Sequence, residues 1–410
     1  MSETLRIFVR DRDDHREIAV YRGARLIEYY REERGDGSRV GAICLGRVQR
    51  VLPEMKTAFV EIDQRLNAYL PLREQMSFER VNAQGKPLRG DDEIIVQIKR
   101  DAHADKGASL TRDITLPGQY VVLMPMNDYL GVSKRVSDEG ERAALLEIGR
   151  GLQKAGFGLI MRYAALFARR DAMEEELQEL LETWNALREK APFLKPPAVL
   201  WQEPSALNAL ARDYAPRYQL SIIANNAVNR MPIPNAGGVL WEQQDDLALE
   251  ATLRGLRLEE QLSEALSRVV HLQGGGTLVI DEREALSTID VNTGSDVGAR
   301  EGDDFALRQN LTACPEIARQ LRLRNLSGVI LIDFINMPDD AMRDRVAQAL
   351  ESELAQDRVR CALHGFTKLG LMEMTRKRTR ESLQELLTEP CGACRGSGRR
   401  RARGESEGQR

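Results

Sequence analysis

Hydrophobic and polar residues alternate over short segments in the first part of the chain, which is the spacing of strands rather than helices. LRIFVR and EIAVYRGARLIEYY predict strands within the first 36 residues, and the turn-rich ERGDGS follows them. Between Val40 and about Leu116 stand four more such segments: ICLGRVQRVL, TAFVEID, NAYLPL and DEIIVQIK. Short strands joined by polar loops at this density predict a small closed barrel such as an OB-fold.

Helices and strands alternate in the rest of the chain. The pattern predicts a strand, a helix and a strand within residues 118–166, and then a charged helix over residues 170–190 that PFLKPP ends. Later segments predict, in order, a strand (SIIANNAV), a helix (LRLEEQLSEALSRVV), two strands joined by a tight turn (HLQGGGTLVIDEREALSTIDVN), a helix (DDFALRQNLTACPEIARQLRLRN), a strand (SGVILIDFINM), a helix over residues 339–355 and a strand near VRCALHGF. We therefore expect an α/β chain of the α+β multidomain type.

Composition narrows the class of protein. The chain has 410 residues, of which 42% are hydrophobic, and five cysteines. This length predicts roughly two to four domains. The composition excludes disorder over most of the chain, and five cysteines are too few to form a disulfide scaffold of this size. No apolar run approaches the ~18 residues of a membrane span, and MSETLRIFVRDRDD lacks the core of a signal peptide, so we expect a cytoplasmic protein.

The net charge of −4 excludes a bulk polycation that coats nucleic acid, so any nucleic-acid binding must depend on local patches. Two basic runs lie near the C-terminus: Arg376, Lys377, Arg378 and Arg380, and then Arg399, Arg400, Arg401 and Arg403. Runs of this kind usually form a solvated helix face and a loose tail, and we interpret these two in that way.

Two aspartates interrupt apolar strands near residues 290 and 333. Asp290 and Asn292 are two residues apart in STIDVN and therefore project from the same face. GVILIDFINM is apolar on both faces until Asp333, which predicts a buried central strand. A carboxylate at the end of such a strand is costly unless it is paired or bound to a metal. Two aspartates on neighbouring strand ends would form the hard-oxygen site that Mg²⁺ prefers. The alternative is that both are turn or cap residues.

The predicted barrel has two aromatic residues on its polar face. Ala58 and Val60 belong to the buried alternation of TAFVEID, so Phe59 faces the other way, and Tyr69 does the same in NAYLPL. Outward aromatic rings on a small barrel are suited to stacking nucleobases. Lys106, in the polar loop DAHADKGAS, could add a phosphate contact. The alternative is that the two rings form a second packing surface.

Cys391 and Cys394 form a CxxC motif within PCGACRGSG. The motif supplies two thiolates, whereas structural zinc takes four ligands. A thioredoxin-like site needs a helix after the motif, and RGSG starts a helix poorly. Cys44, Cys314 and Cys361 stand in apolar or helical contexts typical of buried thiols. A second copy of the chain could complete a tetrahedral zinc site, and the sequence alone leaves this open.

Several of these segments together resemble the catalytic half of the bacterial ribonuclease E/G family. EALSTIDVNTGSD, EIARQLRLRNLSGVILIDFINM, GFTKLGLMEMTRKR and the CxxCxGxG knuckle follow one another in the family's order, and GRVQRVLPEMKTAFVEI, AYLPLRE and KGASLT match in the barrel. The resemblance covers essentially the whole chain. It implies an RNase H-like unit (1–36 and 205–266) interrupted by an OB-fold RNA-binding barrel (37–114) and a 5′-sensor region (115–204), then a DNase I-like catalytic unit (267–388), a zinc-link (389–400) and a basic disordered tail (401–410).

The resemblance also implies an activity and the residues that carry it. The activity is Mg²⁺-dependent endonucleolytic cleavage of single-stranded, AU-rich RNA, leaving 5′-phosphate and 3′-hydroxyl ends, in rRNA processing and mRNA decay, by a zinc-linked homodimer. The matching residues are Asp290 and Asp333 for Mg²⁺, Asn292 for orienting the attack, Phe59, Tyr69 and Lys106 for gripping RNA, Cys391 and Cys394 for the shared Zn²⁺, and Arg162 for reading a 5′-phosphate. The competing class is a non-catalytic RNA-binding protein of the same family. Paired buried carboxylates argue against that class, because a protein that only binds RNA does not need them.

The chain departs from the family pattern in two places. The arginine that reads the 5′-phosphate is commonly followed by threonine, but here Tyr163 follows Arg162. The tyrosine ring could fill the phosphate pocket and weaken the preference for 5′-monophosphorylated RNA. Alternatively, the ring points away and backbone N–H groups complete the pocket. The sequence also ends 16 residues after Cys394, where longer members continue into a small domain that pairs dimers, so we expect tetramers to be absent or weak.

Overall fold

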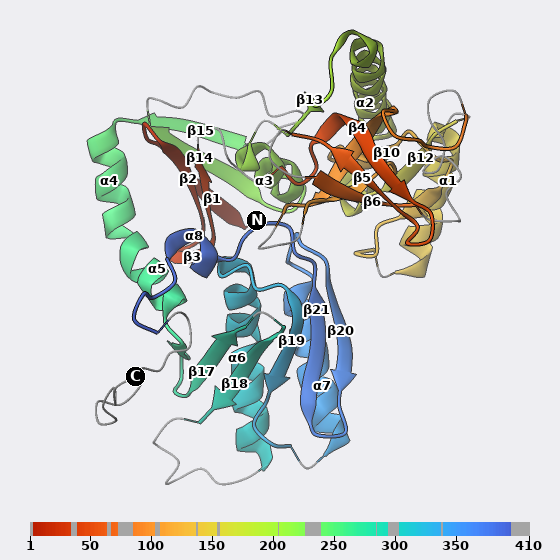
Figure 1. Cartoon of the computed structure of the whole chain (residues 1–410). Helices are drawn as coiled ribbons and strands as arrows, with labels where there is room; N and C mark the ends of the chain where they lie inside the picture. The colour runs from red at the N-terminus through yellow and green to blue at the C-terminus, as the bar shows by residue number, and fades with distance from the viewer. Residues whose placement is uncertain are drawn as a thin grey trace, which may run out of the picture.

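The structure is a computed structural model that describes residues 3–33, 39–63, 67–72, 85–102, 107–136, 138–153, 156–203, 205–225, 239–283, 285–293, 303–337 and 339–394. Lys106 and the predicted tail 401–410 lie outside the described residues. The described strands form four sheets accompanied by helices (Figure 1), so the prediction of a mixed α/β chain is confirmed. No helix in these ranges is long and apolar enough to cross a membrane.

The first sheet joins two distant parts of the chain. Its order is β15-β14-β1-β2-β3, formed by β1 (Thr4–Asp11), β2 (His15–Arg22), β3 (Arg25–Glu33), β14 (Gln219–Asn225) and β15 (Val239–Gln244). One face is covered by α3 (Ala206–Tyr214), and the other by α4 (Asp246–Gly255), α5 (Leu258–Leu266) and α8 (Leu383–Leu387). β1 runs antiparallel to β2 and parallel to β14. The chain leaves this sheet after β3 and returns to it only at β14.

A closed five-stranded barrel follows, and the prediction of a barrel is confirmed. Its strands are β4 (Ile43–Leu52), β5 (Thr57–Glu61), β6 (Asn67–Pro71), β7 (Glu93–Arg100) and β8 (Ser109–Thr111). They run in the order β4-β5-β6-β8-β7, pairing of β7 with β4 closes the ring, and β13 (Ala198–Trp201) also pairs with β4. Ala58, Val60 and Leu70 are buried in the barrel core, as the predicted alternation of β5 and β6 requires.

A four-stranded sheet packs beside the barrel. Its order is β11-β12-β10-β9, from β9 (Leu116–Pro117), β10 (Val121–Met124), β11 (Leu130–Val132) and β12 (Gly158–Met161). It packs with α1 (Glu139–Leu152), α2 (Arg170–Lys190) and two short 3₁₀ helices, η2 (Tyr163–Phe167) and η3 (Ala191–Phe193). Ile43 and Leu45 of β4 belong to the same hydrophobic core, so the barrel and this sheet are packed together. The helix predicted over residues 170–190 has these bounds in the structure.

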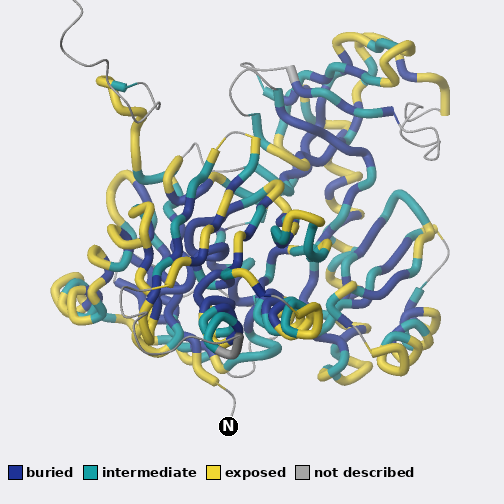
Figure 2. Tube along the Cα trace, turned by 90° about the horizontal axis from the view of Figure 1, so that it is seen from below, coloured by how far each residue is buried: buried dark blue, intermediate teal, exposed yellow. Residues whose placement is uncertain are grey.

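In the part of the chain that the structure describes, helices cover only one face of the last sheet. Its order is β16-β17-β18-β19-β21-β20, from β16 (Val269–His271), β17 (Thr277–Glu282), β18 (Ser287–Asn292), β19 (Gly328–Asp333), β20 (Cys361–Phe366) and β21 (Leu371–Arg376). α6 (Asp303–Leu323) and α7 (Asp340–Leu354) cover the buried residues of these strands and lie behind them in Figure 1. Burial alternates strictly along β18, so its other side faces solvent. We call this side of the sheet the open face. Figure 2 shows the contrast between buried strands and exposed helix surfaces.

Three sequence predictions were wrong in this region. β19 is central but not buried on both faces, since Val329 is 46% exposed on the open face. The helix expected over LRLEEQLSEALSRVV is present as α5, but its predicted end was wrong, because α5 ends at Leu266 and Val269 begins β16. The basic run from Arg376 is not a solvated helix face, because Arg376 ends β21 and is buried. Its neighbour Arg380 lies over the ring of Tyr30, with the guanidinium carbon 4.0 Å from the ring centroid.

Candidate active site and nucleic-acid interface

Asp290 and Asp333 lie directly opposite each other on the open face. β18 and β19 are parallel, and their register pairs these two residues. Both side chains are exposed, because α6 and α7 pack only on the other face. The expectation of paired buried carboxylates was therefore wrong. Their proximity comes from strand register, and neighbouring strands lie about 4.8 Å apart.

Asn292 shares the open face with Asp290. It lies two residues further along β18, and its Nδ2 donates a hydrogen bond to Oδ2 of Asp290 over 2.8 Å. This contact fixes one carboxylate oxygen and turns the amide toward the same side of the sheet. The structure thus brings together all three residues that the sequence singled out for catalysis.

The donors on the open face fit a hydrated magnesium ion. Two carboxylates and an amide oxygen are hard ligands, and Mg²⁺ usually keeps several waters while binding one or two carboxylates. Within the described ranges, no group of three or more His, Cys, Asp or Glu residues is arranged to hold a metal. An exposed pair with room for water suits Mg²⁺ better than an ion that requires a complete protein cage.

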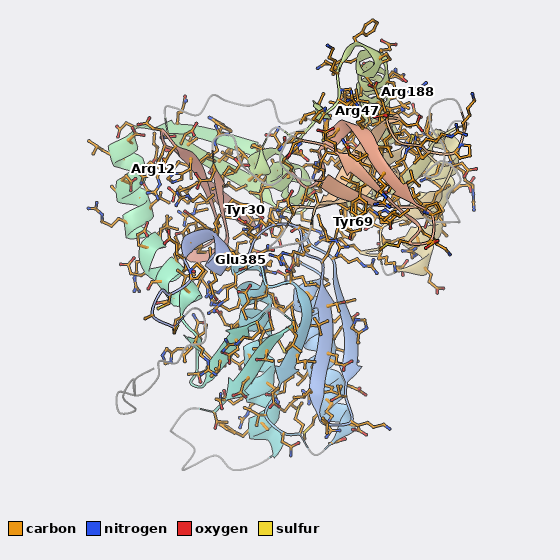
Figure 3. All side chains as sticks on the ribbon, in the orientation of Figure 1. Arg12, Tyr30, Arg47, Tyr69, Arg188 and Glu385 are labelled. Carbon is orange, nitrogen blue, oxygen red and sulfur yellow. The ribbon has the colours of Figure 1, made fainter. Side chains whose placement is uncertain are left out.

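The outward aromatic residues of the barrel lie side by side. Phe59 on β5 and Tyr69 on β6 are cross-strand partners, and both are half-buried with their neighbours in each strand buried. Arg50 of β4 pairs with Phe59 in register, and Nη2 of Arg100 donates to the Tyr69 hydroxyl over 3.1 Å. Figure 3 labels Tyr69 on the barrel. The two rings are thus flanked by two exposed arginines.

Cys391 and Cys394 lie at the end of the described chain. Cys391 is exposed and Cys394 is half-buried, and neither is in a disulfide. Hydrogen bonds from the backbone N–H groups of Cys394 and Ala393 lower the pKa of the Cys391 thiol. A thiolate favoured in this way is suited to binding a metal. Structural zinc takes four donors, and these two thiols could supply two of them.

Arg162 lies in a pocket where the β9–β12 sheet meets α3 and the segment before β20. The pocket has a volume of about 210 Å³ and is lined by Arg135, Arg162, Arg212, Arg217 and Arg358, with Asp213 as the carboxylate among them. Nη2 of Arg162 donates to Oδ1 of Asp213 over 2.8 Å. Burial alone would raise the pKa of Asp213, but Arg162, Arg212 and Arg358 hold it well below its ordinary value.

Tyr163 also lines this pocket. The guanidinium carbon of Arg217 lies 4.1 Å from the centroid of its ring, a cation–π distance. One face of the ring is therefore covered by an arginine that lines the same pocket.

Sequence reasoning missed the arginines that surround these sites. Arg100 ends β7, Arg135 stands between β11 and α1, and Arg217 follows α3. Each is a single arginine in an ordinary polar stretch, and no spacing distinguishes it. Only the packing of separate segments reveals what these residues contact.

The chain is similar in sequence to known proteins over most of its length. A sequence model of the Ribonuclease E/G family matches residues 115–379. The chain is 35% identical over 399 residues to Ribonuclease G of Haemophilus influenzae, covering 93% of this chain and 81% of that protein. It is also 35% identical over 398 residues to Ribonuclease G of Escherichia coli, with the same coverage. To Ribonuclease E of a Nostoc species it is 33% identical over 387 residues, covering 90% of this chain and 56% of the relative. The chain belongs to the Ribonuclease E/G family.

Proposed function

We propose that this protein is a Mg²⁺-dependent endoribonuclease that cleaves single-stranded, AU-rich RNA in rRNA processing and mRNA decay, leaving 5′-phosphate and 3′-hydroxyl ends. The relatives named Ribonuclease G and Ribonuclease E support the reaction class. The observation that carries the proposal is the pairing in register of Asp290 with Asp333, with Asn292 bonded to Asp290, on a solvent-exposed sheet face. An exposed face lets a flexible single strand reach the carboxylates.

Asp290, Asp333 and Asn292 are proposed to have different roles in cleavage. Asp290 and Asp333 would hold the metal, which when bound activates a water and stabilises the charge that develops on the phosphate. Asn292 holds the Asp290 carboxylate in place through its N–H group. The remaining polar atoms of the Asn292 amide can orient the scissile phosphate or the attacking water by hydrogen bonding.

Incubation with a short AU-rich RNA, with and without Mg²⁺, tests the proposal. We expect internal cleavage only with the metal, and products that carry a 5′-phosphate and a 3′-hydroxyl. A GC-rich strand and a duplex of the same length serve as controls and should be cut much more slowly. Binding without any cleavage would favour the non-catalytic RNA-binding alternative, which exposed carboxylates do not exclude by themselves.

The barrel is proposed to grip the RNA through Phe59, Tyr69 and, outside the described residues, Lys106. Phe59→Ala should weaken single-strand binding by about 1–3 kcal/mol, the usual worth of one stacked base. The barrel should stay folded, since the ring is outside its core. Fluorescence anisotropy measures the affinity and thermal melting the stability. Phe193→Ala, at a residue that is 89% exposed on η3, is the matched control and should leave binding unchanged. A large loss of thermal stability in Phe59→Ala would show instead that the ring packs within the fold.

Cys391 and Cys394 are proposed to share one Zn²⁺ with the same pair in a second chain, forming a homodimer. Cys391→Ser should release zinc and convert dimers to monomers, because neither chain alone has four ligands. Light scattering and metal analysis measure the two effects. Cys361→Ser, at a half-buried thiol, is the control and should keep both the metal and the dimer. A stable dimer without zinc would rule out this role for the motif.

Arg162 and Tyr163 are proposed to belong to a 5′-phosphate sensor. Arg162→Ala should reduce the ratio of cleavage rates on 5′-monophosphorylated and 5′-hydroxyl RNA by about tenfold or more, because a charge-assisted hydrogen bond is typically worth about 1.5–3 kcal/mol. Arg188→Ala, at an exposed arginine on α2, is the control and should leave the ratio unchanged. A strong monophosphate preference that survives Arg162→Ala would place the sensor elsewhere.

A further inference from the structure

Phe167 is an exposed aromatic residue beside the arginine pocket, and phosphate sensing makes no use of it. It ends η2 and is 65% exposed. A single exposed ring needs no explanation by itself. This ring, however, meets the ring of Tyr163 edge-on, with the centroids 5.4 Å apart. Tyr163 is one of the residues that line the arginine pocket, so Phe167 contacts the ring of a pocket-lining residue.

The pocket has more positive charge than its own carboxylates balance. Arg212 and Arg358 are paired with Glu203 and Glu28 as well as with Asp213. Arg135 and Arg217, by contrast, donate to the backbone carbonyls of Asp357 and Ala355. In the part of the chain that the structure describes, neither forms a salt bridge with a carboxylate.

The positive charges of Arg135 and Arg217 also repel each other. Burial, and after it the charge of Arg217, lowers the pKa of Arg135. A bound anion would relieve both effects, and arginine presents a fork of N–H donors that matches phosphate oxygens. Arg217 additionally lies against Tyr163, so the same cation faces the cavity and supports the aromatic pair. The arginines that could bind a phosphate are therefore adjacent to the rings of Tyr163 and Phe167.

We propose that Phe167 stacks on the nucleobase of a 5′-phosphorylated nucleotide whose phosphate enters the arginine pocket. The site then recognises a nucleotide and not a phosphate alone. This inference rests on the proposed phosphate sensor at Arg162. The terminal nucleotide of an RNA and a free nucleoside 5′-monophosphate share this chemistry, and the experiment separates the two sources.

Isothermal titration of the full chain with adenosine 5′-monophosphate and with ribose 5-phosphate tests the base contact. Stacking on an aromatic side chain should make the nucleotide bind on the order of tenfold more tightly than the sugar phosphate. Phe167→Ala should remove this difference and leave ribose 5-phosphate binding unchanged, while Phe167→Trp should keep the difference. Phe193→Ala, at another exposed ring, is the matched control and should behave as wild type.

The outcomes separate the base contact from the phosphate site. Equal binding of the two ligands to wild type, or a difference that persists in Phe167→Ala, would overturn the role of Phe167. In either case, a loss of affinity for both ligands in Arg162→Ala would still support the phosphate sensor. Failure of every phosphate ligand to bind would overturn the sensor and the stacking site together. Competition between adenosine 5′-monophosphate and a 5′-monophosphorylated pentanucleotide, but not its 5′-hydroxyl form, would identify the RNA terminus as the ligand.

Discussion

Replacing Asp333 by asparagine is expected to abolish RNA cleavage and to leave RNA binding nearly unchanged. Asparagine keeps the shape of the side chain but lacks the charge that a bound Mg²⁺ needs. Asp290→Asn should have the same effect, because the two residues are register partners on the open face. Loss of a residue that only orients a metal ligand typically costs about 10–100-fold, so loss of a ligand itself should cost more than that. Asn292→Ala, which removes the hydrogen bond to Asp290, should fall within the lower range.

The measurement compares cleavage of the AU-rich RNA at limiting and at saturating Mg²⁺, together with binding and thermal melting. Both aspartates are exposed and the strands pair through their backbones, so the variants should remain folded. Asp128→Asn, at an exposed aspartate before β11, is the matched control and should cut at the wild-type rate. Cleavage near the wild-type rate by either Asp290→Asn or Asp333→Asn at limiting Mg²⁺ would show that the metal lies elsewhere.

Local patterns predicted those parts of the fold that depend on neighbouring residues. The barrel followed from period-two alternation in β5 and β6, and the helix Arg170–Lys190 from apolar spacing with prolines beyond its end. The open face of β19 did not follow, because an apolar strand looks the same whether one face or both are covered. β21 was missed for a different reason. Arg376 looked solvated in a basic run, and its buried partner Asp357 stands 19 residues earlier.

In the candidate site, too, local sequence patterns predict some features and not others. That Asp290 and Asn292 share a face follows from strand periodicity alone. Their position beside Asp333 depends on the parallel pairing of β18 with β19, which α6 separates in the chain, so no local spacing contains it. The arginine pocket is harder still to foresee. Arg135, Arg162 and Arg217 come from three separate segments, which come together only where they line one pocket.

The buried ion pair of Asp357 and Arg376 gives the largest expected effect on stability. Asp357 is 2% exposed and Arg376 4%, and Nε of Arg376 donates to the carboxylate over 2.8 Å. Arg376 also donates to Oδ1 of Asn325 over 2.7 Å and to the carbonyl of Leu326 over 3.0 Å. Burial opposes the charge on Arg376, but Asp357 more than offsets this and raises its pKa above the ordinary value. The pair joins the end of β21 to the segments after α6 and α7.

Asp357→Ala is therefore expected to lower the free energy of unfolding of the β16–β21 unit by about 3–5 kcal/mol, the typical cost of leaving a buried charge unpaired. Urea titration followed by circular dichroism measures the loss. Asp340→Ala breaks an exposed pair with Arg343 on α7 and should cost no more than about 1 kcal/mol. Asp357→Ala combined with Arg376→Met should recover part of the stability, since the unpaired charge is then gone. An unchanged urea midpoint in Asp357→Ala would mean that the two hydrogen bonds to Asn325 and Leu326 suffice to hold Arg376. Because β21 pairs with β19, which carries Asp333, the destabilised variant should also lose cleavage at lower temperatures than wild type.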